Sequence, residues 1–382
     1  MVNAGRAFKR WVLGPPFPRT NSYREPATRD SLWLKIGLRT EIPEHGRQLF
    51  TGTLQQRNRV WREFRNYARQ AKTYDDSARR VKGSSAALLH YYVALNLAKA
   101  ELLISRQSAI MGTVIRHGLS YRPTAAQTIS GDFLTVQDGV FPLLYEKRTG
   151  VTLPTGTRLP IKRLLASCLE IGWEYETLGL GESRVGSALH AMGFDDQQAW
   201  SLFAIDRTLC IDDQSVTARL FRRHYEEISQ PEEWRDKFAV SRRFFAGRFR
   251  FFESRRSHPI AYSPQGDILP PGLIPVLDNV WNALHLIIDE PTVEAYDVFL
   301  CPSLFKSRML PMPASLARYA LMFYVSSLVR YKPSQLDPQT YARQAWILDS
   351  FTDLAAPLLI RAALSGIEQV PHVYFSEEAF RL

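Results

Sequence analysis

The spacing of apolar positions predicts that the first half of the chain is largely helical. In residues 53–80, Val60, Phe64, Tyr67 and Ala68 recur at helical spacing, and Arg and Gln fill most of the other positions. Residues 86–105 are apolar on nearly all sides, which is typical of a helix inside a domain rather than on its surface. The pattern therefore indicates a solvent-facing helix followed by a buried one.

Breaks in the pattern set the ends of these helices and of others. Gly83-Ser84-Ser85 predicts a break with an N-cap, and a short helix that runs to about Ile115 is expected to end with Gly118 in the left-handed conformation. Further helices are expected over residues 160–178, 184–192, 214–227, 232–245 and 274–289, and over residues 313–367 on either side of Lys332-Pro333.

Other stretches favour extended structure. Residues 1–30 are rich in Arg and Pro and predict an extended arm, residues 31–39 fit a short strand or helix, and residues 119–160 predict loops with short strands. The alternating run RFRFFE, residues 248–253, and the run VEAYDVFLCP, residues 293–302, predict a small antiparallel sheet. We expect a mainly α chain, α+β overall, with four parts: a basic arm (1–50), a helical domain (51–246), a β-rich insertion (247–302) and a C-terminal helical region packing on the helical core (303–382).

Composition narrows the class of protein. The chain is 45% hydrophobic, which is too apolar for a disordered protein, and three cysteines cannot form a disulfide framework. The N-terminus has no continuous apolar segment of the kind a signal peptide needs. The longest apolar stretch contains Lys99 and Glu101, which are costly to bury in a bilayer. We therefore expect a cytoplasmic protein without a membrane partner.

Arginine dominates the basic residues. Of the 48 basic residues, 38 are Arg and 10 are Lys, and the formal net charge is +10. Arg binds phosphate in a planar fork, which favours nucleic acid as a partner; a G+C-rich coding sequence gives the same bias without functional meaning. Eleven Arg fall in two aromatic-rich stretches, residues 57–69 and 242–256. The candidates for nucleic-acid binding are Arg57, Arg62, Arg65, Arg242, Arg243, Arg248 and Arg250, and the alternative is that they form ordinary charged faces of a helix and a strand.

Familiar catalytic motifs are missing. The sequence has no zinc-ligand spacing, no phosphate-loop lysine motif and no nucleophile elbow, so we expect no metal and no cofactor. An Arg followed four to six residues later by His, the spacing used by helical ribonucleases of the HEPN type, occurs three times. At this Arg content chance gives about as many matches. Arg219 and His224 form the best pair, and the alternative is a solvated basic helix face.

Four stretches in order resemble the bacterial YaaC-like family. They are residues 67–74 followed by SAALLHYY and LNLAKA (85–100), RHGLS (116–120), FLTVQDGVF (133–141), and residues 316–333 ending in LVRYKP. The family usually has a Trp shortly after the last motif, where this chain reads Ser334-Gln335-Leu336-Asp337. The arm and residues 180–245 have no counterpart in the resemblance.

The resemblance implies a helical core distantly similar to HEPN domains, which include ribonucleases, toxins and defence components. The residues carried over are Asn96, Lys99, His117, Gly118, Arg330 and Tyr331. If they converge, Asn96, Lys99, His117 and Tyr331 would line a basic pocket for phosphate, with His117 and Arg330 as candidate catalytic residues. Each also has a structural alternative: a polar partner in the core, a helix cap, or a cation at a helix C-terminus.

Three functions stay open on this sequence. The first is binding of nucleic acid or a nucleotide, within a bacterial antiviral defence or stress complex. The second is a metal-independent HEPN-like ribonuclease that uses Arg219 with His224, or His117 with Arg330. The third is an adaptor whose Arg residues meet an acidic protein partner.

Overall fold

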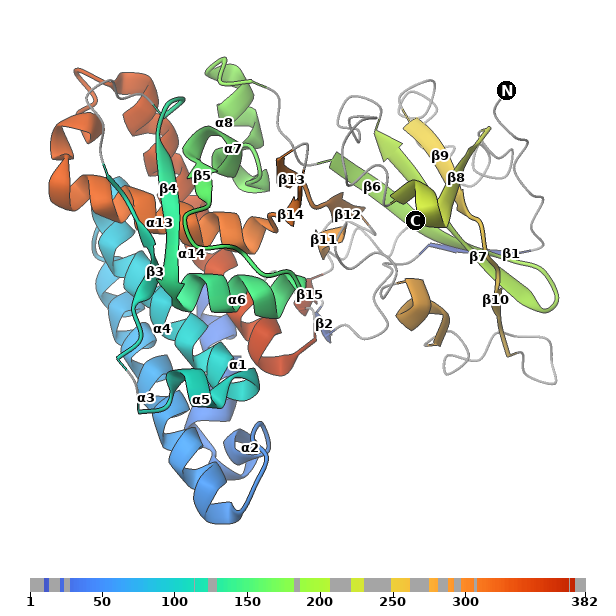
Figure 1. Cartoon of the computed structure of the whole chain (residues 1–382), viewed down its shortest axis with the longest axis horizontal. Coiled ribbons are helices and arrows are strands. Elements are labelled where there is room, and N and C mark those ends of the chain that lie inside the picture. Colours follow the sequence, from blue (N-terminus) through green and yellow to red (C-terminus); the bar gives the residue numbers. More distant parts are fainter. Residues whose placement is uncertain are drawn as a thin grey trace. The chain divides into compact units, whose positions relative to one another are not determined.

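The computed structural model describes most of the chain. The described residues are 10–13, 21–23, 28–112, 114–122, 129–181, 186–206, 221–229, 249–261, 275–280, 288–291, 297–305, 308–370 and 372–374. Contacts divide the chain into a helical unit, Ala27–Ser183 with Met312–His372, and a sheet unit, Met1–Pro26 with Arg184–Pro311 and Val373–Leu382. Figure 1 labels the elements of both units, which are described separately.

Four long helices form the core of the helical unit. They are α3 (Leu54–Ala78), α4 (Ala87–Ser105), α13 (Ala314–Tyr331) and α14 (Ala342–Glu368). Helix α4 packs against the other three, so apolar residues on nearly all of its sides are buried. These helices confirm the helices predicted within residues 53–80, 86–105 and 313–367, including the break at Lys332-Pro333.

The composition of helix α4 would also fit a membrane-spanning helix. Gly83–Ser105 is long and apolar enough to cross a membrane, and 67% of its most apolar window is buried inside the protein. Its Glu101 has no exposed surface and pairs with Lys147 and Arg148 of a neighbouring helix. The segment is therefore packed as a core helix of the helical unit.

Shorter elements surround these helices. They are α1 (Arg29–Glu41), α2 (Pro43–Arg47), η1 (Gly83–Ala86), α5 (Gln107–Ile110), α6 (Val140–Thr149), α7 (Ile161–Leu165), η2 (Leu169–Ile171), α8 (Gly172–Thr177) and η4 (Pro333–Leu336). An antiparallel sheet, β3-β4-β5, joins β3 (His117–Ser120), β4 (Phe133–Gly139) and β5 (Arg158–Pro160). The helix expected over residues 160–178 is broken, because Cys168 adopts an extended conformation between α7 and η2.

The turn at His117-Gly118 differs from its prediction. It does not end a helix, since both residues lie in strand β3. Gly118 does have a positive φ, +86°, but for a different reason than a helix end. A Cβ on Gly118 would lie 2.6 Å from Pro142 Cδ and 2.9 Å from the backbone nitrogen of Phe141, so glycine permits the start of α6 to approach β3.

The sheet unit is built on an antiparallel sheet of order β11-β12-β6-β7-β9-β8, with β1 paired to β6 and β10 to β7. Its strands are β1 (Arg10–Leu13), β6 (Gly186–Phe194), β7 (Gln198–Asp206), β8 (Tyr225–Ile228), β9 (Phe249–Ser254), β10 (His258–Pro259), β11 (Ile288–Pro291) and β12 (Asp297–Leu300). Two smaller pairs are β13 (Ser303–Phe305) with β14 (Arg308–Pro311), and β2 (Asn21–Tyr23) with β15 (His372–Tyr374).

The helix predicted for residues 184–192 is wrong, because the described residues of this segment, from Gly186 on, belong to strand β6. It forms a hairpin with β7, and the turn between them is set by Asp195, whose Oδ1 accepts hydrogen bonds from the backbone nitrogens of Gln197 and Gln198. The doublet Asp195-Asp196 between two apolar runs was the turn signal.

Other predictions in this unit meet mixed outcomes. Strand β9 confirms the alternating run RFRFFE, and β12 confirms a strand within residues 293–302. In the stretch 214–227, residues 221–224 are helical and Tyr225 begins β8. In the stretch 274–289, residues 275–280 are helical and Ile288 begins β11. The helix expected over 232–245 lies outside the described residues.

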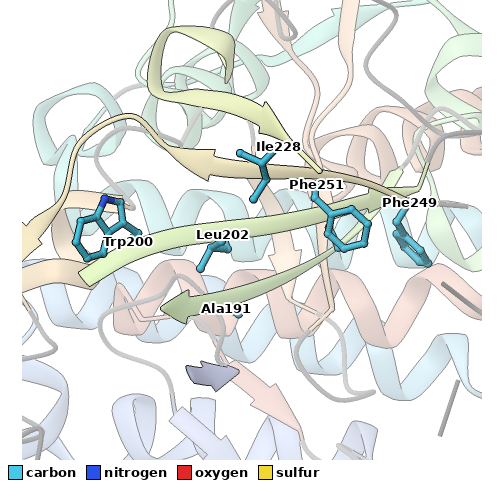
Figure 2. Packing of buried hydrophobic residues seen from close by; sticks show 7 residues of the cluster. Ala191, Trp200, Leu202, Ile228, Phe249 and Phe251 are labelled. Carbon is cyan, nitrogen blue, oxygen red and sulfur yellow. The ribbon is translucent and has the colours of Figure 1, made fainter. Parts of the chain in front are cut away.

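Both faces of this sheet carry buried apolar clusters. One face carries a cluster of Ala191, Trp200, Leu202, Ala204, Ile228, Phe249 and Phe251, which Figure 2 shows along β6, β7, β9 and β8. The opposite face packs Met192, Phe194 and Ala199 against Val276 of the helical residues 275–280. The described residues are thus mainly helical in one unit, with one small antiparallel sheet, and largely antiparallel sheet in the other.

Candidate functional site

His117 and Arg330, both on the helical unit, lie within range of an electrostatic interaction. His117 begins β3, and Arg330 lies in the last turn of α13. Burial lowers the pKa of His117, and the charge of Arg330 lowers it further. The backbone nitrogen of Leu119 donates to His117 Nδ1 at 3.3 Å. In the neutral imidazole the proton therefore sits on Nε2, which makes that nitrogen a donor.

The Arg330 guanidinium is held in place by its own helix. Its Nε donates to the carbonyl of Ser326 at 3.1 Å, and its Nη2 lies 3.5 Å from Ser327 Oγ. Its Cζ lies 5.0 Å from the ring centroid of Tyr331, whose surface is 66% exposed. A planar cation and an exposed ring are thus presented together beside His117.

A chain of aromatic rings leads from His117 to helices α4 and α3. Phe323 lies 5.0 Å from the His117 ring centroid and 5.3 Å from that of Tyr91. Tyr91 is 5.6 Å from Tyr92, and Tyr92 stacks on Tyr74 of α3 at 5.1 Å with an interplanar angle of 24°.

Only some of these rings reach solvent. Phe323 and Tyr91 are buried, whereas Tyr74 and Tyr92 are half-buried. Burial and the neighbouring Tyr92 raise the pKa of Tyr91, and the nearby charge of Arg330 opposes this rise. We call the accessible residues, Tyr74, Tyr92, His117, Arg330 and Tyr331, the tyrosine–arginine surface.

Two of the residues expected in a common pocket lie further along α4. Asn96 Nδ2 donates to the carbonyl of Tyr92 at 2.8 Å, so this buried amide is satisfied within its own helix. The Lys99 ammonium lies 5.3 Å from the ring centroid of Tyr67 on α3, and burial lowers its pKa. The structure thus brings His117 within electrostatic range of Arg330, which lies over the Tyr331 ring. Asn96 and Lys99 instead contact residues of the α3–α4 pair.

The arginines of α3 differ in their contacts and in their exposure to solvent. Arg65 Nη2 lies 3.4 Å from Glu41 Oε2, and its guanidinium lies 5.4 Å from the Trp61 ring, so it braces α3 against α1. Arg57 is half-buried. Arg59 and Arg62 are exposed, and no carboxylate among the described residues pairs with them.

Strand β9, in the arginine-rich stretch of the sheet unit, offers less positive charge to an external partner, because Arg250 is already paired. Arg250 forms a two-pronged ion pair with Glu227, with Nε–Oε1 at 2.9 Å and Nη2–Oε2 at 2.6 Å, and it lies over the Phe252 ring. His224 is exposed, and its carbonyl accepts a hydrogen bond from the backbone of Arg255. The remaining candidates Arg219, Arg242, Arg243 and Arg248 lie outside the described residues.

Sequence reasoning did not single out the stacked tyrosines. Tyr92 lies inside a run that is apolar on all sides, and such a Tyr is normally part of a core. The available signal was the polar hydroxyl at both Tyr74 and Tyr92, on two helices joined by a short break. Within the described part of the chain, no group of three or more His, Cys, Asp or Glu side chains could hold a metal ion.

Comparison with known proteins identifies a family. The family model described as YaaC-like Protein matches residues 51–365, which is most of the chain. No curated protein and no solved structure matched the chain. The match includes every residue of the tyrosine–arginine surface and leaves α1 and α2, which pack against α3, wholly outside it.

Proposed function

The chain belongs to the YaaC-like family, and we propose that it binds nucleic acid through the tyrosine–arginine surface of its helical unit. The observation that carries this proposal is the position of Arg330. Its guanidinium is anchored by Ser326 and lies against Tyr331, so it is oriented before any ligand arrives. An oriented guanidinium loses less freedom on binding phosphate than a mobile one does.

Neighbouring groups support the same function. The exposed ring of Tyr331 and the half-buried ring of Tyr92 offer surfaces on which bases can stack. The Nε2 proton of neutral His117 is a donor suited to a phosphate or base oxygen. Elsewhere on α3, the exposed Arg59 and Arg62 add positive charge to the helical unit, and no carboxylate among the described residues pairs with them. A HEPN-like core and a place in an antiviral defence or stress complex belong to the proposal through the sequence resemblance alone.

The test is salt-dependent binding with a matched pair of variants. Nucleic-acid-free protein is titrated into labelled RNA and DNA by fluorescence anisotropy between 50 and 200 mM salt, about the range over which phosphate contacts weaken strongly. Arg330→Gln should weaken binding and lower the slope of log affinity against log salt by about one. The control is Arg158→Gln, because Arg158 is also exposed and lies 4.6 Å from an aromatic ring, that of Phe133.

The two variants remove the same charge from the protein. An effect of Arg330→Gln alone supports binding at the tyrosine–arginine surface, since a long-range electrostatic effect would weaken binding equally in both variants. Absence of binding to RNA and DNA at every salt concentration contradicts the proposal, and so does equal weakening by Arg158→Gln.

A metal-independent ribonuclease is the second candidate, and the closeness of His117 to Arg330 favours it. Such a reaction needs a base for the 2′-hydroxyl and a cation for the phosphate. The Leu119 hydrogen bond to Nδ1 leaves Nε2 protonated, so neutral His117 can donate from Nε2 but cannot accept there. For this reason binding stands first. RNA cleavage in EDTA that is lost in His117→Ala would favour the ribonuclease, and unchanged cleavage would remove His117 from it.

A further inference from the structure

We infer that the tyrosine–arginine surface is specific for unpaired nucleic acid, with a base stacked on Tyr331 and an adjacent phosphate on Arg330. This inference rests on the proposed function, and it adds the class of nucleic acid. It follows from two features of the surface. Accessible aromatic rings outnumber permanent cations, and the rings lie where bases can reach them.

Exposed rings favour a strand whose bases are free. In a duplex each base is covered on both faces by its neighbours, so an aromatic side chain finds a base face only at an end or in an unstacked step. Tyr331 is 66% exposed, with the Arg330 guanidinium near its ring. The pair Tyr74–Tyr92, stacked at 5.1 Å, adds a second aromatic platform.

Low charge at the surface disfavours a duplex. Duplex binding neutralises phosphates of both strands and uses many Lys and Arg side chains. The surface has one arginine, Arg330, and a histidine, His117, whose pKa is lowered by burial and by the charge of Arg330. Three tyrosines and one permanent cation fit a strand that is held mainly by stacking.

A second cation–ring pair lies outside the tyrosine–arginine surface, further along the α3–α4 pair. Lys99 lies over Tyr67 about two helical turns, roughly 10 Å, beyond Tyr92 along α4. Glu63 lies close enough for its charge to contribute to the raised pKa of Tyr67, so a carboxylate opposes phosphate at this end. We therefore place the principal base at Tyr331 rather than at Tyr67.

The experiment compares strands of one sequence with and without a complement. Anisotropy titrations at one salt concentration use a labelled 12-nucleotide RNA, the corresponding DNA, and each as a blunt duplex. The unpaired strands should bind at least tenfold more tightly than the duplexes. Tyr331→Leu should weaken single-strand binding roughly tenfold and leave duplex binding unchanged, because only free bases stack on the ring.

Matched variants separate stacking from folding. Tyr331→Phe keeps the ring and should retain single-strand affinity. Tyr341→Leu is the control, because Tyr341 is also an exposed tyrosine of the helical unit, at 37%, and lies outside the surface. Its affinity should equal that of the unchanged protein.

The outcomes distinguish this inference from the proposed function. Equal binding of strands and duplexes, or no effect of Tyr331→Leu, overturns the preference for unpaired nucleic acid. If nucleic acid still binds and Arg330→Gln weakens that binding, the proposed function stands without the preference for unpaired strands. No binding of any of the four ligands overturns both.

Discussion

Glu101 on α4 and Arg148 on α6 form an ion pair whose carboxylate has no exposed surface. Arg148 Nη2 lies 2.5 Å from Oε2 and Nε lies 3.2 Å from Oε1. Lys147 Nζ adds bonds to Oε1 at 3.1 Å and to the carbonyl of Gly366 on α14 at 3.0 Å. One carboxylate thus ties α4, α6 and α14 together. Burial raises the pKa of Glu101, but Arg148 and Lys147 outweigh this and hold it below its usual value.

Removing this charge should destabilise the protein strongly. Glu101→Gln keeps the size of the side chain but leaves Lys147 and Arg148 with uncompensated charge in a buried site. We expect a loss of about 3–5 kcal/mol in the free energy of unfolding, measured by urea denaturation. The control is Glu146→Gln, which breaks the partly exposed pair with Arg106 and should cost no more than about 1 kcal/mol. Similar losses in both variants would contradict this account.

Gly366 should not tolerate a side chain, because a Cβ there would lie 2.2 Å from Glu101 Cδ and 2.4 Å from both carboxylate oxygens. Gly366→Ala should therefore push the carboxylate away from its cations and cost about 2 kcal/mol or more. Gly37 of α1 is the matched position, since a Cβ there meets no atom within 4 Å. Gly37→Ala should be neutral or stabilise by about 0.5–1 kcal/mol. The opposite signs can be read from thermal unfolding midpoints, and a stabilising Gly366→Ala would refute the clash.

The helices of the core could be predicted from sequence because their signal is local. The spacing of Val60, Phe64, Tyr67 and Ala68 predicts the inner face of α3. The first two and Ala68 are buried, and Tyr67 is half-buried. The hairpin β6–β7 could not be separated from a helix by apolar content alone, and its turn signal at Asp195 depends on recognising two short runs. In this segment, strand pairing across β6, β7 and β9 outweighed the local preference of the residues for a helix.

The candidate site was predictable in part. His117 and Arg330 stand in family-like motifs, but their distance depends on the packing of β3 against α13, which no local pattern specifies. Tyr92 was hidden because exposure is a tertiary property: it is half-buried while Tyr91 beside it is 2% exposed. The surface as a whole therefore required the structure.

Helix α4 shows the same dependence on distant residues, which leads to a third prediction. The break at Gly83-Ser84 was expected to supply its own cap, but the backbone nitrogen of Ser84 donates to Asp349 Oδ1 at 2.6 Å and that of Gly83 to Asp353 Oδ1 at 3.2 Å. These carboxylates of α14 satisfy backbone donors before α4 and complement its N-terminal dipole.

Asp349→Ala should lower the free energy of unfolding by about 1–2 kcal/mol, the usual cost of losing a helix cap. The control is Asp76→Ala, because Asp76 is an exposed carboxylate of α3 that pairs only along its own helix with Lys72. Urea denaturation of both variants provides the comparison. An Asp349→Ala protein as stable as Asp76→Ala would show that the long-range cap contributes nothing.

A last prediction concerns acid and His90 of α4. His90 Nδ1 lies 3.3 Å from Arg29 Nη2, and Arg29 is in turn bound to Asp75, which also accepts from Trp33 Nε1 at 2.8 Å. Burial, and then the charge of Arg29, lower the pKa of His90 to about 4, although Asp75 opposes the shift. An unfolded chain has a histidine pKa near 6.5, so between pH 6.5 and about 4 the unfolded state binds the additional proton. Stability should therefore be full above pH 6.5 and fall as the pH drops towards 4, by up to about 3 kcal/mol from this group.

His90→Gln separates this contribution from other acid effects. His372, whose pKa burial also lowers to about 4, is unchanged in the variant and contributes equally to both proteins. The free energy of unfolding at pH 7.0 and 4.5 should fall less in His90→Gln than in the unchanged protein, because Gln cannot take up the proton. His45→Gln, at an exposed histidine of α2, should lose as much as the unchanged protein does. If His90→Gln lost the same amount, the buried imidazole would not be the group that couples acid to unfolding.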